Sequence, residues 1–382
     1  MRLSTDRILV THVGSLPRSQ AVCDLVFGKE AGRRSEDAAY KATIADAVQD
    51  VVRRQAEARV DVVSDGEMSK ISYATYIKDR LTGFEGDSPR PIPADLEAFP
   101  GYVQRLQKGG GPSYRRPRCT GPIKVKDMAP LREDIANMKA ALARTSGIVE
   151  GFMNAASPGV IAMFQPNDHY PSHEAYLGAL AEAMQAEYEE IHRAGLVLQI
   201  DSPDLGVGRH MMFKSESEAD FLRHAASHVE ALNHALRNIP PSAVRLHVCW
   251  GNYEGPHHCD IDLERILPTV LKARAQAISF EAANPRHAHE WTVFEEQRLP
   301  DDKVLMPGLL DSCTNYVEHP KLVAERICRF AGIVGRERVL AGTDCGFSTF
   351  AGMGRVDPDV VYAKLGALSE GAAIASDRLW RK

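Results

Sequence analysis

The sequence predicts an α/β protein built as a single (β/α)8 TIM barrel. Short apolar runs rich in Val, Ile and Leu alternate with amphipathic segments of helical period, as in a parallel sheet whose strands are buried on both faces. Polar residues gather at the carboxyl end of at least seven runs, for example "SDGE" after the second and "TDCG" after the last. Catalytic loops follow every strand of a closed barrel, whereas an open doubly wound sheet places its site near one switch point. The pattern therefore favours the closed barrel.

The expected helices and strands can be assigned in order along the chain. Segments 174–195 and 218–238 have the spacing of amphipathic helices between strands. Nine candidate strands are one more than a barrel needs, and 120–125 is the weakest because a Pro/Gly-rich stretch precedes it. The candidates span residues 7–14, 59–66, 120–125, 158–164, 196–201, 243–250, 277–284, 303–311 and 338–346.

One catalytic domain over residues 1–382 accounts for the length. The chain is 44% hydrophobic and 25% charged, which is ordinary globular usage and enough for one large barrel core. Residues 83–118, with "KGGGPSYRRP", are rich in Pro and Gly. No second core follows them, so we expect a loop excursion from the barrel and not a linker.

Charge and cysteine usage limit the partners. The net charge of −5 provides no basic field for a polyanion, so nucleic acid is not an expected partner. Seven cysteines, an odd number without a repeating framework, indicate reduced thiols and a cytoplasmic protein. No apolar run approaches the roughly 20 residues of a membrane span, so no membrane partner is expected. The sequence leaves the oligomeric state open, including a homo-oligomer.

Four side chains at strand ends form a candidate zinc site. His247 and Cys249 are two apart in one strand, so both point to the same side with Cα atoms about 6–7 Å apart. Glu281 and Cys345 follow two later strands at the same rim. Each of the four alone is an ordinary core or surface residue, but together they are an N/O/S₂ set suited to tetrahedral Zn²⁺. The denser cluster at 257–259 lies in a Gly/Pro-rich loop, and we expect it to hold no ion.

The motifs resemble those of the cobalamin-independent methionine synthase superfamily, and the chain is identified as a single-barrel member. "HVC", "FEAAN" and "TDCG" are similar to its three zinc-ligand motifs, in the same order. "VGSLPRS", with Gly14, Ser15 and Arg18, resembles the segment that contacts homocysteine. "SDGEMSK" and "LQIDSPDL" place Glu67 and Asp201 where the family binds the amino group. The resemblance covers nearly the whole chain.

The resemblance implies a barrel of the methionine synthase/uroporphyrinogen decarboxylase type and a zinc-dependent methyltransferase of methionine biosynthesis. Its acceptor is then homocysteine or a similar amino-acid thiol. The expected ligands suit this chemistry, because zinc deprotonates a thiol that is mostly protonated at neutral pH. Two thiolates and one carboxylate give the ion a formal charge of −1, which keeps an incoming sulfur nucleophilic. Zinc hydrolases usually carry neutral histidines instead.

The segments that would contact the methyl donor depart from the family pattern. The family's folate-stacking Trp has no counterpart in "MFQPNDHYPSH", where Tyr170 is the aromatic candidate. The family's D-x-H segment reads "LLDSC" here, so Asp311 is kept and Cys313 replaces the histidine. We assign Asp311 and Cys313 to the catalytic end, with His319 near in sequence. Methyl-folate, another methylated small molecule and a methylcorrinoid protein all remain candidate donors.

Three other functions fit parts of this sequence. An epoxyalkane:coenzyme M transferase also activates a thiol on zinc, but its sulfonate needs cations such as Arg18 or Lys70, whereas Glu67 and Asp201 suit an ammonium group. A decarboxylase of the uroporphyrinogen type needs no metal, and the four ligands argue against it. A non-catalytic zinc protein would leave Glu67 and Asp201 without a purpose. The sequence therefore favours alkylation of an amino-acid thiol.

Overall fold

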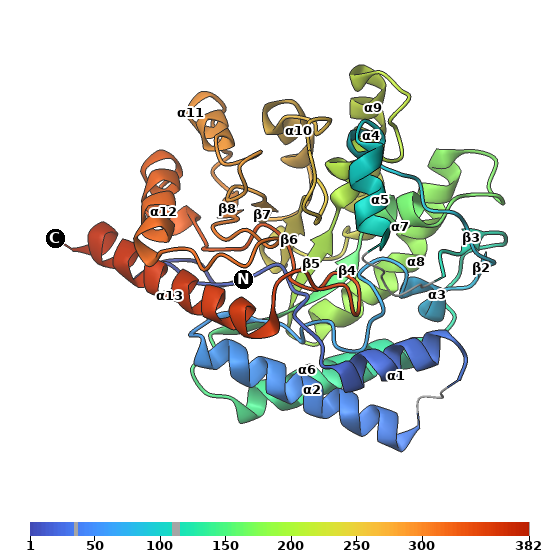
Figure 1. Cartoon of the computed structure of the whole chain (residues 1–382), viewed down its shortest axis with the longest axis horizontal. Coiled ribbons are helices and arrows are strands. Elements are labelled where there is room, and N and C mark those ends of the chain that lie inside the picture. Colours follow the sequence, from blue (N-terminus) through green and yellow to red (C-terminus); the bar gives the residue numbers. More distant parts are fainter. Residues whose placement is uncertain (34–36, 109–114, 382) are drawn as a thin grey trace.

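A curved parallel sheet forms the centre of the molecule (Figure 1). The structure is a computed structural model that describes residues 1–33, 37–108 and 115–381. Six strands pair in the order β1-β4-β5-β6-β7-β8, and every pair is parallel. They are β1 (Val62–Val63), β4 (Glu150–Ala156), β5 (Val197–Asp201), β6 (Val244–His247), β7 (Ala277–Phe280) and β8 (Val304–Pro307).

Two further extended segments close this sheet into a ring. Parallel bridges join Leu305 of β8 to Val339, and Ala341 to Val10. The Val62 amide of β1 then donates to the Val10 carbonyl at 3.0 Å. Eight parallel segments thus surround one axis, which confirms the predicted barrel. Seven of the nine candidate strands contribute to this ring.

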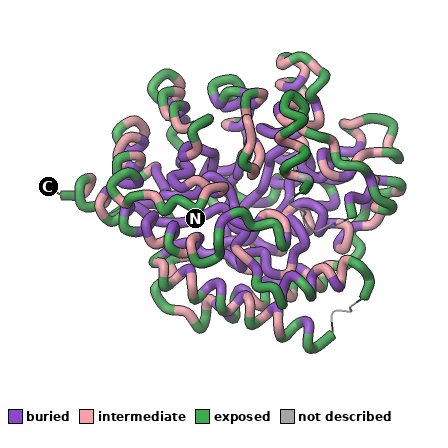
Figure 2. The backbone as a smooth tube through the Cα atoms, in the orientation of Figure 1, coloured by how far each residue is buried: buried purple, intermediate pink, exposed green. Residues whose placement is uncertain are grey.

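Helices cover the outside of the barrel, and the buried residues concentrate at its centre (Figure 2). The predicted helices at 174–195 and 218–238 correspond to α8 and α9. Side chains of Ser172 and Ser217 cap their first turns, accepting from backbone amides. The larger helices are α1 (Gln20–Glu30), α2 (Ala38–Glu57), α6 (Ala129–Arg144), α8 (His173–Arg193), α9 (Glu218–Ala235), α10 (Leu263–Val270), α12 (Pro320–Val334) and α13 (Pro358–Trp380). Within the described ranges, no helix combines the length and apolarity needed to cross a membrane.

The predicted strand at 158–164 is wrong. Residues Pro158–Phe164 form helix α7, and the barrel strand in this region is β4, which comes just before them. Ser157 caps the helix, with its Oγ accepting from the Val160 amide at 3.0 Å, and Pro158 occupies the first turn, where no amide is needed. The helix start that this Ser-Pro pair favours prevails over the strand that the apolar run after it would favour.

The predicted strand at 120–125 does not join the barrel either, and the excursion at 83–118 has secondary structure of its own. Within it, β2 (Phe84–Glu85) pairs antiparallel with β3 (Arg118–Cys119), and two helices, α4 (Ala94–Glu97) and α5 (Pro100–Lys108), lie between them. Residues 109–114 of "KGGGPSYRRP" lie outside the described residues. The Ala94 amide donates to the His210 carbonyl at 2.9 Å, so α4 is fastened to the loops at the carboxyl end of the barrel.

Candidate metal centre and substrate cavity

Three of the four predicted metal ligands meet at the carboxyl end of the barrel. His247 is the last residue of β6, Cys249 follows two positions later, and Cys345 lies after the last barrel segment. Their ligand atoms all lie within 4.8 Å of one another, and the two Sγ atoms are 3.7 Å apart. No other group of three His, Cys, Asp or Glu side chains in the described ranges meets this spacing.

The donor atoms of this trio fit a soft divalent ion such as Zn²⁺. Burial lowers the pKa of His247 to about 3, so its imidazole is neutral at pH 7. Its Nδ1 lies 3.1 Å from Ser279 Oγ, while its buried Nε2 has no hydrogen-bond partner. The hydrogen bond to Cys345, together with burial, raises the pKa of Cys249 well above its ordinary value. An unpaired imidazole nitrogen beside two buried sulfurs is what a zinc ion requires, since a bound cation would both accept the lone pair and stabilise the thiolates.

Glu281, the fourth predicted ligand, lies beside the trio but outside it. Its Oε1 accepts from the Trp250 amide at 2.7 Å, and its Oε2 accepts from Asn284 Nδ2 at 2.8 Å. Burial raises the pKa of this carboxyl group. Trp250 directly follows Cys249, so Glu281 is bonded to the ligand-bearing segment itself.

The metal trio opens into a cavity of about 680 Å³. Glu67 and Asp201 line the same cavity, as does Ser15. The structure therefore brings the two predicted carboxylates and the three metal ligands to one space, although they come from four different segments of the chain. This volume is within the range of small-molecule sites, roughly 300–1,000 Å³.

Burial raises the pKa of both carboxyl groups, Glu67 and Asp201. Asp201 ends β5, and its oxygens accept from Asn154 Nδ2 at 2.9 Å and Gln199 Nε2 at 2.8 Å. Burial raises the pKa of Asp201 to about 6 and that of Glu67 to about 7. Glu67 Oε2 is buried without a hydrogen-bond partner. These acids are poised to accept a cation, because an ammonium group would satisfy the open oxygen and stabilise the charged carboxylate.

The "VGSLPRS" residues support these carboxylates. Gly14 has φ +138°, and a Cβ on it would lie 2.2 Å from Asn154 Oδ1, so only glycine fits against the amide that holds Asp201. Arg18 donates to the Glu67 carbonyl at 2.6 Å and to the Ser348 carbonyl at 2.7 Å. Arg18 therefore positions the Glu67 backbone and does not line the cavity.

Asp311 and Cys313 lie next to the cavity and not on its wall. The Asp311 carboxylate accepts from the Cys313 amide at 2.7 Å and so closes a local turn. Cys313 Sγ contacts Asn252 Oδ1 at 3.3 Å, and burial raises the pKa of this thiol. Asn252 does line the cavity, and it donates to the Gly346 carbonyl at 2.7 Å. The predicted catalytic pair thus reaches the cavity through Asn252.

Neither Tyr170 nor His319 lines the cavity. The Tyr170 ring stacks on Tyr176, and the exposed His319 caps α12. The aromatic wall is formed instead by Tyr73, Phe164 and Phe350, whose ring centroids lie 5.6–6.4 Å apart. These rings are far apart in the sequence, and no local pattern could have identified them as neighbours.

The loop after the metal ligands contains a buried network that the sequence did not indicate. Asp260 Oδ2 lies 2.9 Å from His257 Nδ1 and 3.0 Å from His287 Nε2. Although burial opposes it, the hydrogen bond to Asp260 raises the pKa of His257 to about 9. Tyr253 lines the cavity, and its hydroxyl donates to Asp95 of α4 at 2.7 Å. The histidine-rich loop thus fastens the excursion to the barrel, and its histidines are absent from the metal group.

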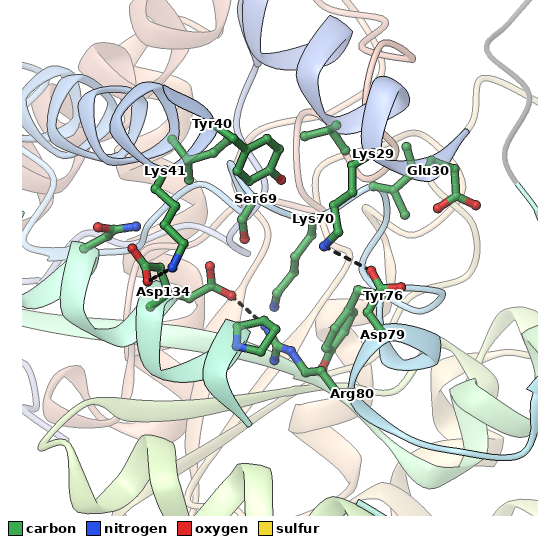
Figure 3. A pocket seen from close by; sticks show the side chains of 16 residues that line it. Lys29, Glu30, Tyr40, Lys41, Ser69, Lys70, Tyr76, Asp79, Arg80 and Asp134 are labelled. Carbon is green, nitrogen blue, oxygen red and sulfur yellow. Dashed lines mark hydrogen bonds and ion pairs between the residues drawn. The ribbon is translucent and has the colours of Figure 1, made fainter. Parts of the chain in front are cut away.

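A second cavity, of about 50 Å³, lies between α1, α2 and α6 (Figure 3). Arg80 pairs there with Asp134 at 2.6 Å and with Glu187 at 2.9 Å. Lys70 lines the same cavity, and its Nζ donates to the Asn154 carbonyl at 2.7 Å. The space holds only a few waters, so this cluster of ion pairs is not a substrate site.

Nearly the whole chain is similar to proteins that are named methionine synthase. The sequence profile described as "Cobalamin-independent synthase, Catalytic domain" matches residues 8–356. The protein named methionine synthase of Saccharolobus solfataricus is 23% identical over 375 residues, covering 97% of this chain and 96% of that protein. A B12-independent methionine synthase from Shewanella sp. W3-18-1, solved in complex with selenomethionine, superposes with a TM-score of 0.74 at 20% identity, covering 98% of this chain and 99% of that one. A putative vitamin-B12-independent methionine synthase from Listeria monocytogenes superposes with a TM-score of 0.66 at 17% identity, covering 98% and 100%. With the profile spanning most of the barrel, this chain belongs to the family of cobalamin-independent synthase catalytic domains.

Proposed function

We propose that this protein is a zinc-dependent methyltransferase that methylates the thiol of homocysteine or of a similar amino acid. One observation carries the proposal: the His247, Cys249 and Cys345 trio and the carboxylates of Glu67 and Asp201 open into one cavity. An amino-acid thiol has a sulfur at one end and an ammonium group at the other. The family and the names of its relatives support the same activity.

Each part of the cavity has a task in this proposal. When bound, zinc supplies a thiolate at neutral pH from a thiol that is otherwise protonated. Glu67 and Asp201 bind and orient the ammonium group, and Arg18 keeps the Glu67 backbone in place. We include Glu281 with the zinc site, as a ligand or through its bond to the Trp250 amide. Ser15 and Gly14 complete the acceptor end.

The donor occupies the rest of the cavity. An amino-acid thiol fills only part of 680 Å³, and Tyr73, Phe164 and Phe350 also line this cavity. We propose a methylated small molecule there, with methyl-folate as one candidate and a corrinoid protein as the alternative. Asp311 and Cys313 act at this end through Asn252.

The contacts of two cations disfavour a coenzyme M thiol. Arg18 donates to the Glu67 and Ser348 carbonyls, and Lys70 donates to the Asn154 carbonyl. Both cations therefore have backbone partners, while the acceptor end presents two carboxylates. A sulfonate placed beside these carboxylates would be repelled.

We further propose a single catalytic domain that works in the cytoplasm, since all seven cysteines are unpaired. Its partners are the small-molecule thiol and the donor.

The test is a thiol and donor panel with matched variants. Purified protein is assayed for zinc content and for methylated product by mass spectrometry, with homocysteine, cysteine and coenzyme M as acceptors. We expect Glu67→Gln and Asp201→Asn to raise KM for homocysteine while zinc content stays at one per chain, and exposed Asp168→Asn to change neither. Preference for coenzyme M, or unchanged KM in both carboxylate variants, would refute the acceptor assignment.

A further inference from the structure

Asp344, the residue before Cys345, binds a whole turn of the neighbouring segment. Its Oδ1 accepts from the amides of Ala282 and Ala283, each at 2.8 Å. Its Oδ2 accepts from the Asn284 amide at 2.8 Å and from Asn284 Nδ2 at 3.1 Å. Four N–H groups thus point at one carboxylate that is only 2% exposed. These three residues directly follow Glu281.

Asn284 connects Asp344 to the segment that carries the other thiol, Cys249. Its Nδ2 also donates to Glu281 Oε2 at 2.8 Å, and Glu281 Oε1 accepts from the Trp250 amide at 2.7 Å. Trp250 follows Cys249, and Asp344 precedes Cys345. One hydrogen-bonded path therefore runs from the Cys345 segment through Asp344, Asn284 and Glu281 to the Cys249 segment.

The neighbouring strand leaves room for this carboxylate. Gly308 follows β8, and a Cβ on it would lie 2.0 Å from Asp344 Oδ1 and 2.6 Å from Asp344 Cα. The Gly308 amide donates to the Phe280 carbonyl at 2.8 Å, just before Glu281. A side chain at this position would therefore displace Asp344 without changing the chemistry of the His247, Cys249 and Cys345 side chains.

We propose that Asp344 is a positioning residue that fixes the Glu281 segment against both thiol-bearing segments and thereby sets the zinc affinity of the site. This inference rests on the proposed function, because it requires that the trio binds zinc. Groups that orient ligands typically change metal affinity by about 10- to 100-fold when they are removed. Asp344 is well placed for such an effect, because it directly precedes Cys345 in the chain. Through the side chains of Asn284 and Glu281 it is also connected by hydrogen bonds to the segment that carries Cys249.

The experiment compares Asp344→Asn and Asn284→Ala with the wild-type chain. An asparagine at 344 keeps one oxygen but turns an NH₂ group toward the Asn284 N–H groups, so part of the contact becomes repulsive. Asn284→Ala removes the side-chain bonds to Glu281 and Asp344, and with them the contacts of Asn284 Oδ1 with the amides of Arg286 and His287, but it leaves three amide contacts to Asp344. This variant should therefore fold even if the first does not. The control is Asp61→Asn, which changes a buried carboxylate that precedes β1, at the end of the barrel opposite to the metal ligands, and that accepts from the Val10 amide at 2.8 Å.

Zinc affinity is measured by chelator competition, and the absorption of the Co²⁺-loaded protein reports the ligand geometry. We expect about 10- to 100-fold weaker zinc binding in Asp344→Asn, a smaller loss in the same direction in Asn284→Ala, and altered Co²⁺ bands in both. Affinities within about twofold of wild type in Asn284→Ala and any folded Asp344→Asn, or an equal loss in Asp61→Asn, would overturn the inference. If the wild-type chain binds no zinc, the proposed function fails with it, whereas normal wild-type binding with unaffected variants defeats only the role of Asp344.

Discussion

Replacing Glu67 with glutamine should weaken substrate binding and at the same time stabilise the free protein. The carboxyl group is buried, and burial raises its pKa from 4.5 to about 7. Below pH 4.5 the group is protonated in both folded and unfolded chains and costs nothing. Between pH 4.5 and 7 the unfolded chain ionises while the folded chain does not, so stability falls as the pH rises. Above pH 7 the full penalty applies.

The size of this penalty follows from the two pKa values. At about 1.4 kcal/mol per pKa unit, the difference between 4.5 and 7 amounts to on the order of 3 kcal/mol. Glu67→Gln removes the ionisable group, so it should remove this loss of stability at pH 8 and leave stability at pH 4 nearly unchanged. In the complex the same change costs a hydrogen bond to a charged ammonium, about 1.5–3 kcal/mol, which corresponds to roughly 10- to 150-fold weaker binding of homocysteine.

The assay combines thermal unfolding at pH 4, 6 and 8 with calorimetric titration of homocysteine into the zinc-loaded protein. The expected result is a higher unfolding temperature than wild type at pH 8, a difference that vanishes toward pH 4, and weaker homocysteine binding. Glu230→Gln is the matched control, because Glu230 lies exposed on α9. A Glu67→Gln protein that is no more stable than wild type at pH 8, or that binds homocysteine equally well, would show that Glu67 is not the buried ammonium-binding acid.

Three further substitutions test other parts of the site. Cys249→Ser should abolish zinc retention and turnover with little change in circular dichroism, because it removes one of three donors from a preformed barrel; retained zinc would contradict this. Gly14→Ala should lower homocysteine affinity at least tenfold, since its Cβ would displace the Asn154 amide that holds Asp201, and calorimetry on the folded variant checks it. His257→Ala should lower the unfolding temperature by several degrees and raise KM for the donor, because the buried network that fastens α4 loses its cation. The nearby Cys259→Ser should change neither quantity, and a matching loss there would show that the loop is merely sensitive to substitution.

Much of the barrel could be predicted because each strand is a local pattern. Apolar runs with polar carboxyl ends identified seven of the eight barrel segments. The error at 158–164 arose because β4 and α7 are both apolar and adjacent, so periodicity alone did not separate them. The Ser157-Pro158 pair is the local indication of a helix start, whereas the predicted strand began at Pro158.

Only those site residues that lie at the ends of strands could be predicted from the sequence. His247, Cys249 and Cys345 meet as expected, because consecutive parallel strands bring their carboxyl ends to one rim. The orientation of Glu281 depends on the Trp250 amide and on Asn284, which are contacts that no local spacing encodes. For the same reason the sequence did not reveal Asp344, the aromatic wall or the network around Asp260, each of which joins segments distant along the chain.

Zinc-edge X-ray absorption, recorded on the zinc-loaded protein before and after homocysteine is added, shows directly whether the metal site binds the thiol of the substrate. We expect one zinc per chain, with two sulfur neighbours at first and a third at about 2.3 Å once the thiol is present. A spectrum that homocysteine leaves unchanged, or zinc with no sulfur neighbours at all, would contradict this expectation.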